Sequence, residues 1–334
     1  MTRRWQLVGR RLASAVVIVL ALTAVLFLLQ QISPLDPVHA MLGPGASRQA
    51  VLAERHRLGL DRPVIVQYLS YVLQLAHGDL GTSYRTRRPV SSDLATFVPA
   101  TAELTVCALV LALVLAVVLA VGTTLRWPGA GLVRLVLIAG ASAPPFLLAL
   151  AGILVFYALL NWLPATGRTD LTGTSSGPTG MLVLDGVMSG RLDLTLDALR
   201  HLVLPAFAVA VGPAVSIGRV LRSSLVAGIQ ADYARTARAK GLREWQVVVR
   251  HVLRNSIGPA LSMAGLQLGL MFAGVVVIEQ VFSWPGVGQY TAESIPVADF
   301  PAIAGVTLLM GIVYVAINTI VDLLQALADP RIDV

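Results

Sequence analysis

The sequence predicts an all-α polytopic membrane protein with six transmembrane helices. Of its 334 residues, 56% are hydrophobic and only 13% are charged, which excludes an ordinary soluble globular protein. As a helix, each of six uncharged runs can cover the ~30 Å hydrocarbon core of a bilayer, the fourth only barely. These runs are residues 12–35, 104–125, 135–167, 202–218, 255–278 and 300–321.

The first run follows a short basic segment, residues 1–11, that carries four arginines. A positive segment before an apolar run also describes a signal peptide, and Val38-His39-Ala40 could serve as its cleavage site. The run is 24 residues long, however, whereas the apolar core of a signal peptide has ~7–15 residues. We therefore expect a spanning helix with its N-terminus in the cytoplasm.

The distribution of basic residues predicts that both termini are cytoplasmic. Fifteen of the 25 lysines and arginines lie in segments that this N-in/C-in arrangement places inside. Seven of the other ten lie in one outer loop, residues 33–97, which is too long for the positive-inside rule to apply well.

The predicted segments alternate between the two sides of the membrane. The transmembrane helices are 12–35, 98–125, 132–161, 201–220, 255–282 and 300–327. The outer loops are 36–97, 162–200 and 283–299, and the cytoplasmic segments are 1–11, 221–254 and 328–334. Pro144-Pro145 and Gly212-Pro213 are expected to bend the third and fourth helices, a feature that suits a translocation path but also occurs without one.

The first outer loop contains two predicted amphipathic helices. One covers residues 47–58 and ends at Gly59, and the other begins after Pro63. The second has four apolar residues on one face, Ile65, Leu69, Val72 and Ala76. We expect both helices to lie on a surface.

A charged island, residues 232–254, separates the fourth and fifth runs. Its first part predicts a helix of about two turns at 233–240, with Asp232 as its N-cap and Gly241 as its left-handed C-terminal residue. Ala234, Ala237 and Gly241 form a small face that another surface can approach closely.

A second helix is predicted directly after the first. Its apolar residues repeat at i, i+3, i+4, i+7 and i+8, and they are Trp245, Val248, Val249, Val252 and Leu253. We expect this stripe to lie against the membrane or neighbouring spans. On composition alone, the island could also be an ordinary basic loop beside the membrane.

Several kinds of site are not expected. The one cysteine, Cys107, allows neither an internal disulfide nor a cysteine metal cluster. The histidines at 39, 56, 77, 201 and 251 show no ligand spacing, so no metal site is predicted. Lys240 is the single lysine, and its neighbours form no P-loop. We therefore predict no catalytic residue and no cofactor bound by this chain.

Three acidic residues lie at the margins of the predicted spans: Glu103, Glu279 and Asp322. Charges in spans are costly and often functional. At the margin of a span, a charge can also reach the headgroups or pair with a neighbour. None of the three is assigned to a substrate.

Several sequence motifs together resemble ABC importer permeases of the oligopeptide, dipeptide and nickel family. The most specific is the EAA motif of the cytoplasmic loop, Asp232-Tyr233-Ala234-Arg235-Thr236-Ala237-Arg238-Ala239-Lys240-Gly241-Leu242. Others are Leu42-Gly43-Pro44, Gly78-Asp79-Leu80-Gly81, Arg88-Pro89-Val90, residues 201–205 and 278–288, and Asp329-Pro330-Arg331. Arg235-Thr236-Ala237 replaces the Glu-Ala-Ala of the wider pattern, and Arg254 replaces its proline, which fits the peptide and nickel branch rather than sugar permeases.

The resemblance implies a type I ABC importer permease fold, with the membrane-spanning permease domain at 98–327. It implies binding-protein-dependent transport across the cell membrane of a prokaryote by a multi-pass, B-type subunit. The expected partners are a second homologous permease, two cytoplasmic ABC ATPases that bind ATP and magnesium, and an extracytoplasmic substrate-binding protein. The eleven residues of the EAA motif would form the coupling helix against an ATPase. Peptides are the first expected cargo, with nickel or another small solute next.

Two other classes remain as alternatives. A secondary transporter driven by an ion gradient would have the same hydropathy, but it would be expected to carry ionisable residues near mid-span. A membrane enzyme would need a motif such as His-Glu-x-x-His or an aspartate-rich magnesium site, and neither occurs. The loop at 232–254 discriminates between importer and secondary carrier, because only the importer needs it.

Overall fold

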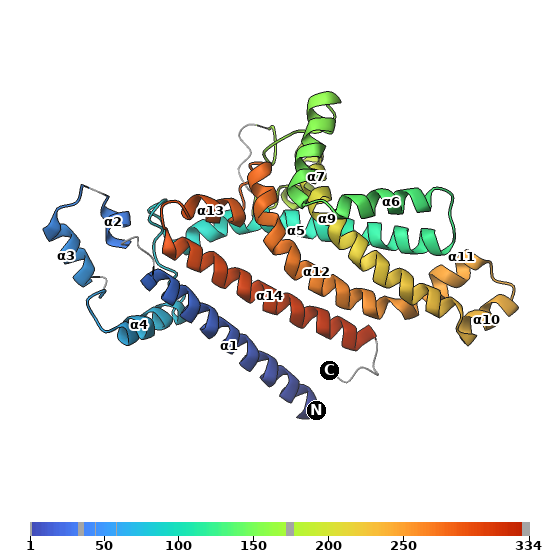
Figure 1. The fold of residues 1–334 in the computed structure, drawn as a ribbon, viewed down its shortest axis with the longest axis horizontal. Coiled ribbons are helices and arrows are strands. Elements are labelled where there is room, and N and C mark those ends of the chain that lie inside the picture. Colours follow the sequence, from blue (N-terminus) through green and yellow to red (C-terminus); the bar gives the residue numbers. More distant parts are fainter. Residues whose placement is uncertain (1, 33–36, 44, 58, 172–176, 329–334) are drawn as a thin grey trace. The chain divides into compact units, whose positions relative to one another are not determined.

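A computed structural model describes residues 2–32, 37–43, 45–57, 59–171 and 177–328 (Figure 1). Within these ranges it describes no side chains for residues 2–15, 37, 39, 40 and 322–328. The described residues form helices and connecting loops without a β-strand, apart from one isolated antiparallel bridge between Thr82 and Pro89. The chain divides into two compact units, Met1–Val98 with Gly286–Ala316, and Pro99–Pro285 with Ile317–Val334.

The first unit is built from both ends of the sequence. It contains α1 (Thr2–Ile32), α2 (Pro37–Leu42), α3 (Arg48–Arg57), α4 (Val64–Ala76), the start of α5 (Val90–Thr124), α13 (Val287–Ser294) and most of α14 (Phe300–Ala328).

The second unit holds the remaining helices. They are the rest of α5, α6 (Ala130–Ala141), α7 (Pro145–Gly152), the π-helix η1 (Ile153–Leu159), α8 (Leu182–Met188), α9 (Leu192–Ile229), α10 (Asp232–Ala239), α11 (Glu244–Gln246), the π-helix η2 (Val247–Val252), α12 (Leu253–Val281) and the end of α14.

Four described helical segments are long and apolar enough to cross a membrane: Val90–Thr124, Leu192–Ile229, Glu244–Val281 and Phe300–Val321. A fifth arises if α6 and α7 with η1 form one broken span. The first predicted span falls on α1, where Val16–Ile32 is apolar. The helical, multi-pass architecture is thus confirmed, while the count of six and the N-in/C-in orientation stay predictions.

The third predicted span is sharply bent. Ala130–Ala141 and Pro145–Leu159 meet at 113°, on either side of the segment that holds Pro144. Pro144 has an extended backbone (φ −56°, ψ 142°) because a residue followed by proline is driven out of the helical region. The bend predicted from Pro144-Pro145 is therefore confirmed. Pro213, by contrast, lies inside α9, which continues through it as one helix.

The second unit is packed around α9. Of the most apolar part of this helix, 72% is buried, against 44% for α5 and 28% for the span Glu244–Val281. Its most extensive partner is α12, which runs beside it in Figure 1. Because most of its apolar part is buried within the protein, α9 can carry polar residues at both ends, which explains why the uncharged run of the predicted fourth span is short.

A buried ion pair joins α5 to the loop after η1. Arg168 Nη2 lies 2.5 Å from Glu103 Oε2, and the two side chains are 10% and 4% exposed. The other oxygen of Glu103 accepts a hydrogen bond from the backbone N–H of Val183 at 2.7 Å. Pairing with a neighbour, one of the roles considered for Glu103, is thus what the structure shows.

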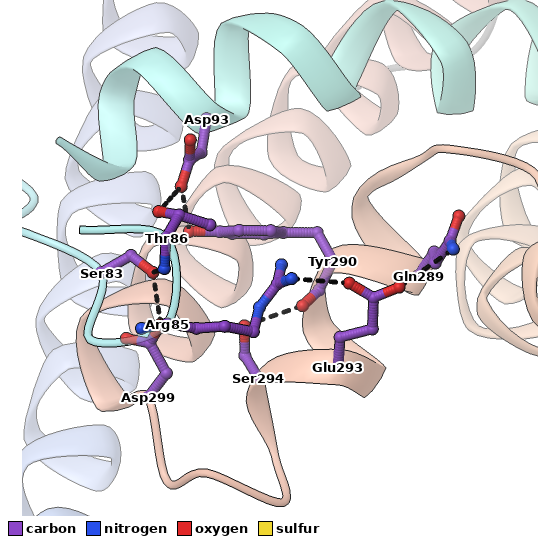
Figure 2. A network of polar contacts seen from close by, with 9 residues as sticks. All are labelled: Ser83, Arg85, Thr86, Asp93, Gln289, Tyr290, Glu293, Ser294 and Asp299. Atoms are coloured by element: carbon purple, nitrogen blue, oxygen red, sulfur yellow. Dashed lines mark hydrogen bonds and ion pairs between the residues drawn. The ribbon is translucent and has the colours of Figure 1, made fainter. Parts of the chain in front are cut away.

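The first unit contains a polar network that holds the segment before α5 (Figure 2). Asp299 Oδ2 accepts hydrogen bonds from Ser83 Oγ at 2.5 Å and from the backbone N–H of Arg85 at 3.1 Å. Asp93 Oδ2 accepts from Tyr290 Oη at 3.0 Å. The Arg85 guanidinium lies over the Tyr290 ring and pairs with Glu293. Side chains thus fix this loop to α13.

Helices occupy both positions predicted in the loop 36–97, as α3 and α4. Ser47 Oγ accepts a hydrogen bond from the Ala50 N–H at the start of α3, and Gly59 follows it with φ +68°. On α4, Ile65 and Leu69 are 74% and 61% exposed, so its apolar face is not covered within the described residues. This exposure supports a surface-lying helix.

Replacing Arg168 with methionine should strongly destabilise the chain, because Glu103 would keep a buried charge without a partner. Breaking a buried pair in this way costs about 3–5 kcal/mol. The double variant Glu103→Gln/Arg168→Met should recover most of the loss. The midpoint of thermal unfolding in detergent measures both effects, and a single variant as stable as the parent would contradict the role of the pair.

Candidate functional site

The helix predicted at 233–240 is present as α10, at the end of the second unit where α9 ends and the span of α12 begins (Figure 1). Its N-cap is Ala231, whose backbone is extended (φ −70°, ψ 155°), and no side chain caps it. The prediction of Asp232 as N-cap is therefore wrong. Asp232 is the first helical residue, where its negative charge interacts favourably with the helix dipole. Its Oδ1 atom lies 3.4 Å from Arg235 Nη1.

The predicted end of the helix is confirmed. Gly241 has φ +82°, a left-handed conformation that costs a residue with a Cβ atom free energy. Its N–H donates to the Arg238 carbonyl at 2.9 Å. A Cβ atom added at Gly241 would meet no atom within 4 Å, so backbone conformation alone makes glycine preferred there.

The small face of α10 is buried against other residues of the same chain. Ala234 is completely buried and Ala237 is 6% exposed, and both belong to a cluster with Val247, Val248 and Val252. The close approach predicted for this face is therefore made by η2. The residues that α10 leaves exposed lie on its other sides, and they are Asp232, Tyr233, Arg235, Thr236, Ala239 and Lys240.

Only part of the apolar stripe predicted on the following helix is buried. Val248 and Val252 are fully buried, but Trp245 and Val249 are 47% and 41% exposed. Val247, outside the predicted stripe, is buried instead. The cause is the π-helix η2: its wider turns place residues five apart, such as Val247 and Val252, on one face, whereas the prediction assumed an α-helical period.

Arg238 braces α10 to both of its neighbours, a role that the sequence did not reveal. Its Nε and Nη2 atoms donate to the two carboxylate oxygens of Glu244 at 3.0 and 2.8 Å. Its Nη1 atom donates to the carbonyl of Ile229, the last residue of α9, at 3.1 Å. A fork of two parallel bonds is the strong form of this ion pair, and the hydrogen bond lowers the pKa of Glu244 from its ordinary value.

Close packing adds to this brace. A Cβ atom at Gly228, near the end of α9, would lie 2.7 Å from Val252 Cγ1 and 2.9 Å from Tyr233 Oη. Ser256 Oγ of α12 donates to the Ser224 carbonyl of α9 at 3.2 Å. Thus α9, α10, η2 and α12 meet without room for a side chain at residue 228.

Of the two remaining acidic candidates, the structure describes the side chain of Glu279 alone. Glu279 is fully buried and accepts a hydrogen bond from Thr101 Oγ1 at 2.5 Å. Nearby, the Trp284 indole N–H donates to the Ala100 carbonyl at 2.9 Å. The side chain of Asp322 and the motif Asp329-Pro330-Arg331 lie outside the described residues.

One side-chain group has the geometry of a metal site, although histidine spacing predicted none. Ligand atoms of Asp170, Asp197 and His201 lie within 4.8 Å of one another. His201 Nδ1 is 2.9 Å from the Asp197 carbonyl, and its Nε2 is 3.5 Å from Asp170 Oδ1. Such a group is common without an ion, so it identifies no metal by itself.

Comparisons with known proteins cover nearly the whole chain. Residues 108–334 match the family described as "Binding-protein-dependent transport system inner membrane component". Residues 4–105 match its N-terminal companion, "Binding-prot-dependent transport system membrane comp, N-term". The match to the inner-membrane component includes α10 and its brace.

Similar proteins of the same length carry transport names. One is the probable D,D-dipeptide transport system permease protein DdpB of Escherichia coli, 39% identical over 98% of this chain and 97% of that protein. Another is the di/tripeptide transport system permease protein DppB of Pseudomonas aeruginosa, 39% identical over 97% and 98%. The dipeptide transport system permease protein DppB of Alkalihalophilus pseudofirmus is 37% identical over 97% and 98%.

Acid should loosen α10, because Glu244 must be ionised to hold Arg238. Its pKa is lower in the folded protein, so the stabilisation is fully present above the ordinary pKa of a glutamate and is lost as the pH falls through the lowered pKa. Glu244 and Arg238 are 51% and 34% exposed, which limits the effect to about 1 kcal/mol or less. The protection of the α10 amides against hydrogen exchange, measured relative to the intrinsic exchange rate at each pH, should therefore fall in acid, and Glu244→Gln should abolish that fall.

Adding a methyl group at Gly228 should destabilise the packing of α9, α10, η2 and α12 against one another. Gly228→Ala would press on Val252 and Tyr233, and overpacking of this kind costs about 1–3 kcal/mol. Gly258→Ala in α12 is the matched control, since no atom lies within 4 Å of its new methyl group. Thermal unfolding of both variants tests the packing, and equal midpoints would argue against it.

Proposed function

Because this chain belongs to the family of inner-membrane components of binding-protein-dependent transport systems, we propose that it is the peptide-conducting permease subunit of an ATP-driven ABC importer. The observation that carries this proposal is α10, a short basic helix fixed to two long apolar helices. The chain performs no chemistry itself. ATP and magnesium bind the partner ATPases.

In this mechanism α10 docks in a groove on a cytoplasmic ATPase. The residues at the contact are those of the motif 232–242, with the exposed side chains of Arg235 and Lys240 toward the partner. Ala234 and Ala237 serve the contact indirectly, since they hold α10 against η2. A movement of the ATPase pair then carries α10 as a rigid body.

The hydrogen bonds of Arg238 determine which helices move with α10. Arg238 ties α10 to the end of α9 and to Glu244 of α11, which leads through η2 into α12, so displacement of α10 tilts α9 and α12 together. Tilting alternately opens the path to the two sides of the membrane. The bend between α6 and α7 gives the third span a break that suits such a path.

The proposed topology has six spans with both termini in the cytoplasm of a prokaryotic cell. It puts α10 on the side of the ATPases and the long loop 36–97 on the side of an extracytoplasmic binding protein. A second homologous permease completes the path. The names of the similar proteins support dipeptides or short peptides as cargo, with nickel or another small solute as the second candidate.

Purification of the tagged chain from its native membrane in mild detergent tests the assembly. Mass spectrometry should find two P-loop ATPases and a second six-span permease, and peptide uptake should stop when ATP is depleted. If the chain is recovered alone, and uptake stops on collapse of the ion gradient instead, it is a secondary transporter and the proposal is wrong.

Substitutions at Gly241 distinguish an effect of backbone conformation from an effect of steric crowding. Gly241→Val and Gly241→Leu should reduce ATP-dependent uptake severalfold or more, because φ +82° strains branched and bulky residues by about 1–2 kcal/mol. Gly241→Asn is the matched control, since asparagine tolerates this conformation and the surrounding space is open within the chain. Uptake with Gly241→Leu equal to that of the parent would refute the role of Gly241.

A further inference from the structure

A pocket of about 510 Å³ opens between α5, α6 and α9 in the second unit, apart from α10 and its brace. Arginines come to it from three different segments: Arg126 from the turn after α5, Arg134 from α6 and Arg222 from α9. A smaller adjoining hollow of about 50 Å³ adds Arg219. The two hollows share Arg134 and Arg222, so they form one site, here named the arginine pocket.

The charges of the arginine pocket are not neutralised within the described part of the chain. No aspartate or glutamate lines either hollow among the described residues. None of the four arginines makes an ion pair with a described carboxylate, and the Nε atom of Arg222 is buried without a hydrogen-bond partner. Guanidinium groups of the same sign repel one another, and a buried N–H without an acceptor costs free energy, so the site favours an anion.

The remaining lining identifies the kind of anion. Leu135, Ile138 and Ala130 of α6 form an apolar wall beside the arginines, and Trp127 contributes an aromatic ring. The wall continues onto the outer side of α6, where Leu132, Val133 and Val136 are between 50% and 67% exposed. Basic groups next to an apolar surface and a tryptophan are the arrangement found where a helix meets the headgroups of a membrane.

We propose that the arginine pocket binds the phosphate group of an anionic phospholipid, with the acyl chains along the apolar side of α6. Guanidinium groups match phosphate oxygens in geometry and charge, and several donors can share one phosphate. A free phosphate ion would satisfy the arginines but leave the apolar wall exposed to water. The bound lipid would link α6 to α9, the helix that α10 is fixed to.

Lipid binding to the full-length chain, purified in detergent with the subunits that accompany it, tests the proposal. Native mass spectrometry would count the bound molecules after addition of phosphatidylglycerol, phosphatidylcholine or inorganic phosphate. The parent should retain phosphatidylglycerol in preference to phosphatidylcholine. Arg134→Gln/Arg222→Gln should weaken that binding roughly tenfold or more, since each basic residue near a lipid phosphate contributes separately to the free energy of binding.

A matched control removes the same charge elsewhere. Arg250→Gln/Arg254→Gln changes two exposed arginines that line neither hollow, and its phosphatidylglycerol binding should equal that of the parent. Thermal unfolding adds a second readout: phosphatidylglycerol should raise the midpoint of the parent and of this control, but not that of the pocket variant. If the double variant does not elute at the same position as the parent, the single variant Arg134→Gln takes its place, because the Arg134 side chain is exposed.

Three results would overturn the proposal. Equal loss of phosphatidylglycerol from both double variants would show that charge anywhere on the chain suffices. Equal retention of phosphatidylcholine by the parent would show that the arginines do not select the headgroup. Stabilisation by inorganic phosphate, with no further effect of phosphatidylglycerol, would identify a free anion as the ligand instead of a lipid.

Discussion

The close packing of α9 against its neighbours is the constraint on which the second unit depends. Buried alanines and glycines, such as Ala210, Ala214 and Gly218, let α5 approach the α9 backbone. At Gly218 a Cβ atom would lie 3.3 Å from the backbone of Ala116, so even one methyl group is tight. In a lipid environment, where apolar surface gains little from burial, such close contact supplies much of the association between helices.

Local features of the sequence predicted the elements well. Four of the apolar runs, the bend at Pro144-Pro145, the two helices of the loop 36–97 and the left-handed Gly241 are each encoded by neighbouring residues, and the structure contains them. The motif at 232–242 likewise indicated α10 before any contact was known. Its functional role rests on resemblance and on the brace, and it stays a proposal.

Contacts between distant residues could not be predicted in the same way. Glu103 and Arg168 are 65 positions apart, and no periodicity relates them. Arg238 looked like one more basic residue of a loop until Ile229 and Glu244 were found on either side of it. Asp232 was assigned to the cap because its residue type favours that position, but the extended backbone at Ala231 starts the helix one residue earlier.

The π-helix η2 has a consequence for the way the joint can move. A π turn holds about one residue more than an α turn, so a helix that contains one carries a spare residue. If that turn shifts along the chain, the residues between its old and new positions rotate by roughly 100° and advance by about 1.5 Å, while both ends keep their hydrogen bonds. Because η2 lies between α10 and the long helix α12, such a shift would rotate and advance the residues between these two helices without breaking the helix on either side.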